Sequence, residues 1–301
     1  MSNLSIVIVN YKSWTPLTIC LDSLLNQKKI NPKIIVLDNN SDDTKFMEFK
    51  SKYKSIHWIK NQDNYGFSKA CNIGSKIVKT EWILFLNPDA SLPKDCLEKL
   101  MNKVSNEKNK IIGIKQLNEK DEDTYAYGNF LSYYSINGIL RFIYRILNNQ
   151  TNKILSKKKS FSPDWISGSF ILIKKKDFDK IGGWDEDFFM YYEDMDICKR
   201  AIRFNIKTQF YNDLYCYHFH GKSSRFDYKT KINSKTQVIR SSHIFIKKHY
   251  GALNAKLISL LLFSSQLIEL IVLSLFIKKK GKFLTSLLKA SCLFLYKIIL
   301  T

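Results

Sequence analysis

The segment at residues 82–90, Trp-Ile-Leu-Phe-Leu-Asn-Pro-Asp-Ala, constrains the fold more than any other part of the chain. Its five consecutive apolar residues are typical of a strand buried on both faces of a parallel sheet. Pro88 ends the strand because proline has no backbone N–H for the ladder. Asp89 then lies at the carboxyl-terminal edge of the sheet, where open α/β sheets bind ligands. Asp89 is therefore the first candidate functional residue, although an Asn-Pro-Asp sequence is also an ordinary turn.

The residues before this strand alternate between strand and helix patterns. Apolar runs predict strands at residues 5–9, 34–37 and 56–59, and helical patterns occupy residues 16–27 and the segment after Phe67 as far as about residue 79. We assign a polar loop, and no helix, after the second strand. This alternation predicts a doubly wound, Rossmann-like sheet flanked by helices. Polar residues cluster at the strand ends, at Asn10, Tyr11, Asp38 and Asp89.

The sequence patterns that predict helices and strands are weaker after the strand at residues 82–86. A helix is predicted at about residues 93–105, and residues 106–124 are interpreted as a solvated excursion around a short strand at residues 111–114. Residues 125–160 are irregular, and we assign no chemistry to them. Further strands are predicted within residues 164–173 and at residues 208–211 and 214–217.

Composition limits the classes of partner and the compartment. The 301 residues are 45% hydrophobic, enough for a large core, and carry 48 basic against 27 acidic side chains, a formal charge of +21. This excess favours an anionic partner, either an acidic lipid surface, a phosphate-bearing substrate or nucleic acid. Nucleic acid ranks last because no recognition helix or aromatic RNA-binding motif is present. A lysine-rich proteome is the alternative source of the charge.

The cysteines and the amino terminus predict a cytosolic body. Six cysteines lie far apart without a Cys-x-x-Cys pair, which indicates reduced core residues. The chain enters its first strand at once, without a basic segment and a cleavable apolar segment, so we expect no signal peptide.

Acidic and aromatic residues are dense at residues 181–196. Glu193, Asp194 and Asp196 open a predicted helix, and acidic residues at this position also serve as simple caps. Capping does not require the aromatic flank at residues 188–192, and a functional carboxylate is therefore the competing hypothesis. Farther along, His218 and His220 follow a strand, and we expect at most one of them to share a metal with Asp89.

These motifs occur in a characteristic order: Val9-Asn10-Tyr11, residues 37–41, residues 64–67 with Asn72, residues 86–89, residues 182–196, and His218 with Gly221 and Ser223. Over residues 4 to about 250, the chain resembles glycosyltransferase family 2, specifically its bacterial rhamnosyltransferase-like branch. The resemblance implies a GT-A fold in residues 1–250, with a nucleotide-sugar-binding half at about 1–110 and an acceptor half at 111–250. Residues 251–301 form a separate tail of apolar helices.

The resemblance also implies roles for individual residues. Donor binding falls on Val9, Tyr11, Asp38, Asn64, Gly66, Asn72 and Asn87, with Tyr11 stacking on the base and Asp38 binding it. The family's Asp-x-Asp motif has Asn87 in place of its first acid here, so Asp89 is the metal ligand, joined by His218. Asp194 is the general base, and Trp165 and Glu193 contact the acceptor.

This assignment is chemically consistent with an inverting sugar transfer. Mg²⁺ or Mn²⁺ neutralises the leaving pyrophosphate, and one carboxylate takes the proton of the attacking hydroxyl from the opposite side. We expect L-rhamnose from dTDP-L-rhamnose to be added to a lipid-linked or polysaccharide acceptor in cell-surface glycan synthesis, such as that of O-antigen. A UDP-hexose or galactofuranose donor would use the same residues, and a catalytically silent sugar-nucleotide or glycan-binding protein is the alternative class.

The tail contains two apolar stretches, at residues 257–277 and 283–300, separated by Lys278-Lys279-Lys280-Gly281-Lys282. The first is long enough to span a bilayer, but Glu269 near its middle is costly there. A basic linker between apolar helices suits a hairpin in the cytoplasmic leaflet of the inner or plasma membrane, with lysines on anionic headgroups. A soluble helix pair that joins two copies in a homo-oligomer is the alternative.

Overall fold

The computed structural model describes residues 3–41, 43–124, 126–131, 146–147, 158–219 and 228–276. The chain divides into two compact units, which are described separately. Unit 1 contains residues 1–129, 156–189 and 193–223, and unit 2 contains residues 130–155, 190–192 and 224–301.

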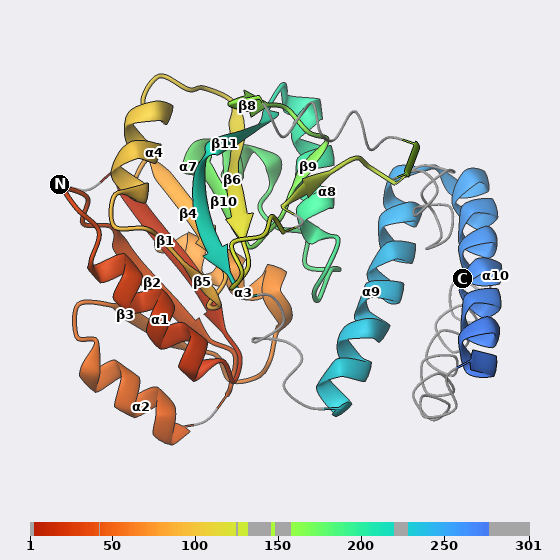
Figure 1. Cartoon of the computed structure of the whole chain (residues 1–301), viewed down its shortest axis with the longest axis horizontal. Helices are drawn as coiled ribbons and strands as arrows, with labels where there is room; N and C mark the ends of the chain where they lie inside the picture. The colour runs from red at the N-terminus through yellow and green to blue at the C-terminus, as the bar shows by residue number, and fades with distance from the viewer. Residues whose placement is uncertain are drawn as a thin grey trace. The chain divides into compact units, whose positions relative to one another are not determined.

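Unit 1 is built on a mixed sheet of nine strands in its described part, ordered β3-β2-β1-β4-β10-β6-β11-β5, with β8 also pairing with β11 (Figure 1). The strands are β1 (Leu4–Asn10), β2 (Lys33–Asp38), β3 (His57–Lys60), β4 (Trp82–Leu86), β5 (Ala90–Ser91), β6 (Lys110–Leu117), β8 (Ser160–Phe161), β10 (Phe170–Lys174) and β11 (Lys207–His218). The first four pair in parallel, and β10 runs antiparallel to β4 and β6. A separate ribbon pairs β7 (Tyr127–Gly128) with β9 (Trp165–Ile166).

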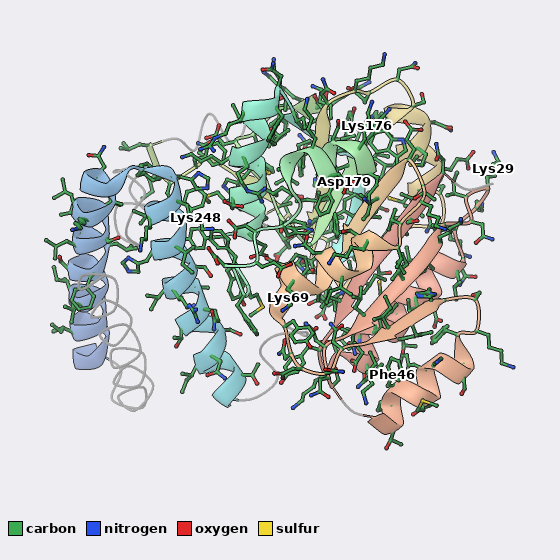
Figure 2. The ribbon with its side chains drawn as sticks, turned by 180° about the vertical axis from the view of Figure 1, so that it is seen from behind. Lys29, Phe46, Lys69, Lys176, Asp179 and Lys248 are labelled. Atoms are coloured by element: carbon green, nitrogen blue, oxygen red, sulfur yellow. The ribbon has the colours of Figure 1, made fainter. Side chains whose placement is uncertain are left out.

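Helices cover both faces of this sheet, because the central strands are apolar on both sides. Side chains of α1 (Trp14–Leu25), α2 (Asp43–Lys52) and α4 (Cys96–Val104) share one core with Ile6 and Ile8 of β1; Phe46 of α2 is labelled in Figure 2. On the other face, α3 (Gly66–Lys76) brings Gly74 against Val7, and α7 (Lys175–Ile181) brings Phe178 into a tilted ring contact with Phe85. The predicted α/β sheet with flanking helices is therefore confirmed.

Several elements differ from the sequence-based expectation. Helix α2 occupies a segment to which no helix was assigned, and α7 was likewise not anticipated. The two strands expected at residues 208–211 and 214–217 are one strand, β11, whose pairing with β6 is irregular between Tyr211 and Tyr215. The sheet also resumes after Pro88 as the two-residue strand β5. Helix α8 (Glu193–Ala201), followed by the 3₁₀ turn η2 (Ile202–Phe204), confirms the predicted helix.

Unit 2 contains α9 (Tyr228–His249) and α10 (Ala252–Phe276). Ile246 of α9 packs with Ala255, Ile258 and Leu262 of α10, and Tyr250 donates a hydrogen bond to the carbonyl of Leu131. The division expected at residue 250 separates these two helices, whereas the compact units group them. Across the described ranges, no helix has the combined length and apolarity needed to cross a bilayer. The basic linker and the second apolar stretch lie outside the described residues.

Candidate active site

Asp89 lies in the turn that follows β4, and this turn leads the chain to a different strand of the same sheet. Asn87 donates its backbone N–H to the carbonyl of Ser169 (3.0 Å), and Ala90 donates to the carbonyl of Asn87 (3.1 Å). The chain then forms β5, which pairs Ala90 with His218 at the end of β11. Pro88 thus ends one strand pairing, and Ala90 and Ser91 enter another. This change of partner places Asp89 next to His218.

The predicted metal ligands Asp89 and His218 are in contact. The distance from His218 Nε2 to Asp89 Oδ1 is 3.3 Å. Both side chains are buried, with 5% of His218 and 1% of Asp89 exposed. The backbone N–H of Phe219 donates to the carbonyl of Asp89 (2.9 Å), which closes the turn around the pair. The resemblance to the family predicted that these two residues lie together, and the β5–β11 pairing brings them together in the structure. His220, Gly221 and Ser223 lie outside the described residues.

Gln116 and Ser169 belong to the same buried cluster and were not predicted from the sequence. Gln116 Oε1 lies 2.9 Å from His218 Nδ1 and accepts a hydrogen bond from Ser169 Oγ, also at 2.9 Å. Ser167 Oγ lies 2.8 Å from Ser169 Oγ. Gln116 escaped prediction because it lies in the segment interpreted as a solvated excursion. In the structure that segment contains β6, which extends to Leu117 and buries Gln116.

The donor set is suitable for a divalent ion held jointly by protein and substrate. A carboxylate oxygen and an imidazole nitrogen converge at Asp89 and His218, and Mn²⁺ accepts both kinds of ligand. Within the part of the chain that the structure describes, no group of three or more His, Cys, Asp or Glu side chains could hold a metal. The assignment of Mg²⁺ or Mn²⁺ stays a prediction.

The second candidate centre is at the start of α8. Asp194 Oδ2 accepts a hydrogen bond from the backbone N–H of Gly168 (3.1 Å), and Asp194 Oδ1 accepts one from Met195 (2.8 Å). Burial raises the pKa of Asp194, and these backbone donors oppose the rise. Burial, followed by the charge of Asp194, raises the pKa of Glu193 well above its ordinary value. The raised pKa values mean that Glu193 and Asp194 both have a high proton affinity.

Of the three acidic residues at the start of α8, Asp196 forms an ion pair along the helix. This side chain is fully buried and pairs with Arg200 Nε at 2.7 Å. Arg200 also donates to the carbonyls of Ile181 and Gly183, which ties α8 to the turn after α7. Asp196 therefore has a structural role. By contrast, Glu193 Oε2 is buried and accepts no hydrogen bond from any described residue.

The residues predicted to bind the nucleotide base lie at the ends of adjacent strands. Val9 and Asn10 of β1 pair with Leu37 and Asp38 of β2. Asp38 is fully buried, and its two carboxylate oxygens accept hydrogen bonds from Asn10 Nδ2 (2.8 Å) and from the backbone of Ser41 (3.0 Å). Tyr11 follows directly and is partly exposed. The position is consistent with base binding, but Asp38 already organises its own turn.

The predicted donor-binding residues near α3 are engaged in contacts within unit 1. Asn64 Oδ1 accepts the N–H of Gly66 (3.1 Å). Gly66 has a φ of +79°, and a Cβ there would lie 2.4 Å from the carbonyl oxygen of Phe189, so only glycine fits without rearrangement. Asn72 donates to the carbonyl of Trp184 and accepts the N–H of the same residue. Their roles in donor binding stay predictions.

The predicted acceptor residues lie on β9 and α8, two elements that contact each other. Trp165 is partly exposed on β9, and its indole Nε1 donates to the carbonyl of Asn129 (3.0 Å). Among the aromatic residues before α8, Phe188 is fully buried and belongs to the core. Tyr191 and Tyr192 have left-handed φ values of 72° and 66°, a conformation that is costly for aromatic residues. No contact in unit 1 joins Trp165 directly to Glu193 among the hydrogen bonds described.

Comparison with protein families identifies one match. The model described as glycosyl transferase family 2 matches residues 5–182. Three curated relatives are similar: the low-salt glycan biosynthesis hexosyltransferase Agl10 of Haloferax volcanii, rhamnosyltransferase WbbL of Escherichia coli and dTDP-rhamnosyl transferase RfbF of Shigella flexneri. Their identities are 29%, 26% and 26%, over 68%, 67% and 74% of this chain. The matches span 64%, 78% and 71% of the respective relatives.

Solved structures confirm the GT-A fold. GalNAc-T7, crystallised with UDP, GalNAc and Mn²⁺, aligns with a TM-score of 0.57 and 16% identity over 80% of this chain and 47% of its own. Residues 1–349 of TarS from S. aureus, in complex with UDP, align with a TM-score of 0.53 and 15% identity over 86% of this chain and 70% of that one.

Proposed function

Because the chain belongs to glycosyl transferase family 2, we propose that it transfers L-rhamnose from dTDP-L-rhamnose to a lipid-linked or polysaccharide acceptor, with inversion at the anomeric carbon. The observation that carries this proposal is the set of hydrogen bonds made by the segment at residues 167–169. Gly168 hydrogen-bonds to the base candidate Asp194, while Ser169 hydrogen-bonds to Asn87 and Gln116 beside the Asp89–His218 pair. One short segment thus holds both centres in place, as a single displacement requires.

Asp194 accepts the proton of the attacking acceptor hydroxyl in this scheme. Its raised pKa makes the carboxylate a better proton acceptor, provided that it is ionised at the working pH. Its two backbone donors orient the carboxylate and limit the rise in pKa. No second carboxylate is required as a covalent nucleophile, which supports inversion.

Asp89 and His218 would hold the divalent ion, and Asn87, at the same turn, lies close enough in sequence to contact the donor diphosphate. When bound, the ion supplies charge neutralisation for the leaving diphosphate. The buried position of Asp89 strengthens its electrostatic attraction for a cation, because solvent screening there is small. Mg²⁺ and Mn²⁺ both meet this requirement.

The choice of donor is supported by the similarity to WbbL, a rhamnosyltransferase, and to RfbF, a dTDP-rhamnosyl transferase. A UDP-hexose is the competing donor, supported by the UDP complexes of GalNAc-T7 and TarS. A thermal-shift screen of the full chain against dTDP-L-rhamnose, UDP-glucose, UDP-galactose, UDP-N-acetylglucosamine and GDP-mannose, with and without Mn²⁺, tests these options. Selective stabilisation by dTDP-L-rhamnose with Mn²⁺ is expected. Stabilisation by a UDP-sugar alone would reassign the donor, and donor binding without turnover on any acceptor would favour a silent binding protein.

We further propose that the enzyme works at the cytoplasmic face of the membrane, with α10 lying on the lipid surface. Helix α10 has two faces, because Ala255, Ile258 and Leu262 pack against α9, whereas another set of apolar side chains is exposed. The exposed set comprises Leu257, Leu260, Leu261 and Ile268, at 53%, 56%, 47% and 56% exposure, and a 3.6-residue period places them on one side of the helix.

Exposed lysines on the two helices of unit 2 favour an anionic lipid as the partner of the apolar face of α10. Lys256 on α10 and Lys247 and Lys248 at the end of α9 are exposed, and Lys278-Lys279-Lys280 follow in the sequence. Apolar side chains enter the boundary between headgroups and acyl chains, and nearby lysines bind anionic headgroups.

A further inference from the structure

We infer that Gln116 is a positioning residue that sets the tautomer of His218 and thereby directs its Nε2 lone pair toward the ion shared with Asp89. The inference rests on the proposed metal site, and it concerns the state of the protein before any ion binds. It assigns a function to a residue that the family motifs do not include.

The first step of the argument is the direction of the hydrogen bond between Gln116 and His218. Gln116 Oε1 lies 2.9 Å from His218 Nδ1, and an amide oxygen only accepts. Nδ1 must therefore carry the hydrogen. A neutral imidazole has one N–H, so His218 Nε2 then presents a lone pair. That lone pair faces Asp89 Oδ1 across 3.3 Å.

Two acceptors at this distance need a cation between or beside them. In the neutral ring the Nε2 lone pair and the carboxylate oxygen repel each other in a buried site, and either a proton on Nε2 or a divalent ion held by both groups removes this repulsion. Imidazole ligands of metals commonly donate their other ring N–H to an oxygen acceptor, which fixes the ring and raises its basicity. Gln116 supplies that acceptor here.

The second step is the reason that Gln116 stays in place. Strand β6 pairs with β11 so that Gln116 lies opposite Cys216, two residues before His218. Side chains two residues apart on a strand point to the same face, so this register aims Gln116 and His218 toward each other. Ser169 Oγ donates to the same Oε1 atom, and Ser167 Oγ lies 2.8 Å from Ser169 Oγ. Gln116 is 1% exposed, so these contacts restrict its rotamer.

A third observation concerns the amide nitrogen of Gln116. Gln116 Nε2 is buried and has no hydrogen-bond acceptor among the described residues. A buried amide N–H without an acceptor is unfavourable. A water molecule or an oxygen of the bound substrate would satisfy it.

The opposite amide orientation is the competing arrangement. Gln116 Nε2 would then donate to His218 Nδ1, and His218 would direct an Nε2–H group at Asp89. Such a pair is a simple hydrogen bond in which Nε2 has no lone pair for a metal. The two arrangements differ in the position of one hydrogen on His218, which nuclear magnetic resonance detects directly.

The first experiment determines this tautomer without metal. The full chain is labelled with ¹⁵N-histidine and measured at about pH 8.5, above the ordinary histidine pKa. Of the five histidines, the His218 signals are those lost in His218→Gln. We expect a protonated Nδ1 and an unprotonated Nε2 in the wild-type protein, and a shift toward the Nε2–H form in Gln116→Met. An Nε2–H tautomer in the wild-type protein overturns the inference.

The second experiment measures Mn²⁺ binding in the presence of dTDP or UDP, by electron paramagnetic resonance of the free ion. Gln116→Met keeps the side-chain length but removes the acceptor, and we expect Mn²⁺ affinity to fall about 10- to 100-fold. Gln116→Glu keeps an acceptor for Nδ1–H and should retain Mn²⁺ binding. Gln209→Met, on β11, is the matched control and should bind Mn²⁺ normally.

The two experiments separate the inference from the proposed function. Wild-type affinity in Gln116→Met would overturn the role of Gln116. The predicted tautomer together with no Mn²⁺ binding by the wild-type protein would instead refute the metal site, while leaving the hydrogen bond from His218 to Gln116 established. Circular dichroism of each variant verifies that it is folded.

Discussion

The backbone N–H of Gly168 donates a hydrogen bond to Asp194 Oδ2 across 3.1 Å, and this contact joins two regions of unit 1. The next residue, Ser169, accepts the N–H of Asn87 with its carbonyl and donates to Gln116 with its hydroxyl. The base candidate and the Asp89–His218 pair are therefore anchored to consecutive residues of one loop. Displacing this loop is expected to affect both centres together.

Replacing Asp194 tests the general base. Asp194→Asn preserves the size of the side chain and its contact with Gly168 but removes the proton acceptor, so we expect transfer to fall by at least about a hundredfold. Nucleotide-sugar affinity, measured by calorimetry, should stay nearly unchanged. Asp187→Asn, an exposed aspartate in the same acidic segment, is the control and should remain active. An active Asp194→Asn enzyme would falsify the assignment.

Replacing Asp89 tests metal-dependent donor binding. Asp89→Ala removes the only carboxylate of the proposed site, and loss of a charged contact of this kind corresponds to about a 10- to 100-fold weaker affinity. We expect this loss for dTDP-L-rhamnose in the presence of Mn²⁺, and little further loss when Mn²⁺ is withdrawn. Asp95→Ala, which breaks only a surface ion pair with Lys99, is the control. Equal affinities of wild-type protein and Asp89→Ala with Mn²⁺ present would contradict the site.

Replacing Glu193 tests the protonation state of the acidic pair. Its pKa in the folded protein is raised, so below the unfolded-state pKa both states are protonated and the contribution to stability is complete. As the pH rises, the unfolded chain ionises first and stability declines until the folded-state pKa is passed. Glu193→Gln avoids this decline and should raise the free energy of unfolding by about 1–3 kcal/mol near neutral pH.

The pH dependence makes this test specific. The advantage of Glu193→Gln over the wild-type protein should shrink as the pH falls toward the ordinary glutamate pKa, as measured by urea unfolding at several pH values. Glu48→Gln changes an exposed residue and should show no such trend. A gain in stability that is constant with pH would indicate improved packing rather than relief of a buried charge.

Charging the exposed face of α10 tests the membrane proposal. Leu261→Asp places a carboxylate among Leu257, Leu260 and Ile268, so we expect about a tenfold or greater loss of binding to vesicles that contain phosphatidylglycerol. Asn233→Asp adds the same charge to the exposed surface of α9 and should bind normally. Failure of the wild-type chain to sediment with these vesicles would exclude the proposal, and a dimer that Leu261→Asp dissociates would assign the face to a second copy.

Local patterns in the sequence determined the longer strands, most helices and the strand ends at which the predicted functional residues lie. The apolar run of β4 and the proline that ends it needed no tertiary information, because burial and the absence of a proline N–H act within a few residues. The motif at residues 193–196 likewise marked the start of α8. The residue pattern alone does not show that Asp196 pairs with Arg200 whereas Asp194 accepts a hydrogen bond from Gly168. These contacts depend on how α8 packs against the neighbouring turn.

Only the tertiary structure decided which of these strand ends meet. A two-residue strand such as β5 has no periodic signal, yet its pairing with β11 joins Asp89 to His218. Gln116 is one polar residue in a lysine-rich segment, and its role depends on the β6–β11 register, which is set by contacts between residues far apart in the chain. Side-chain patterns therefore encode the elements, whereas strand pairing across the sheet creates the candidate site.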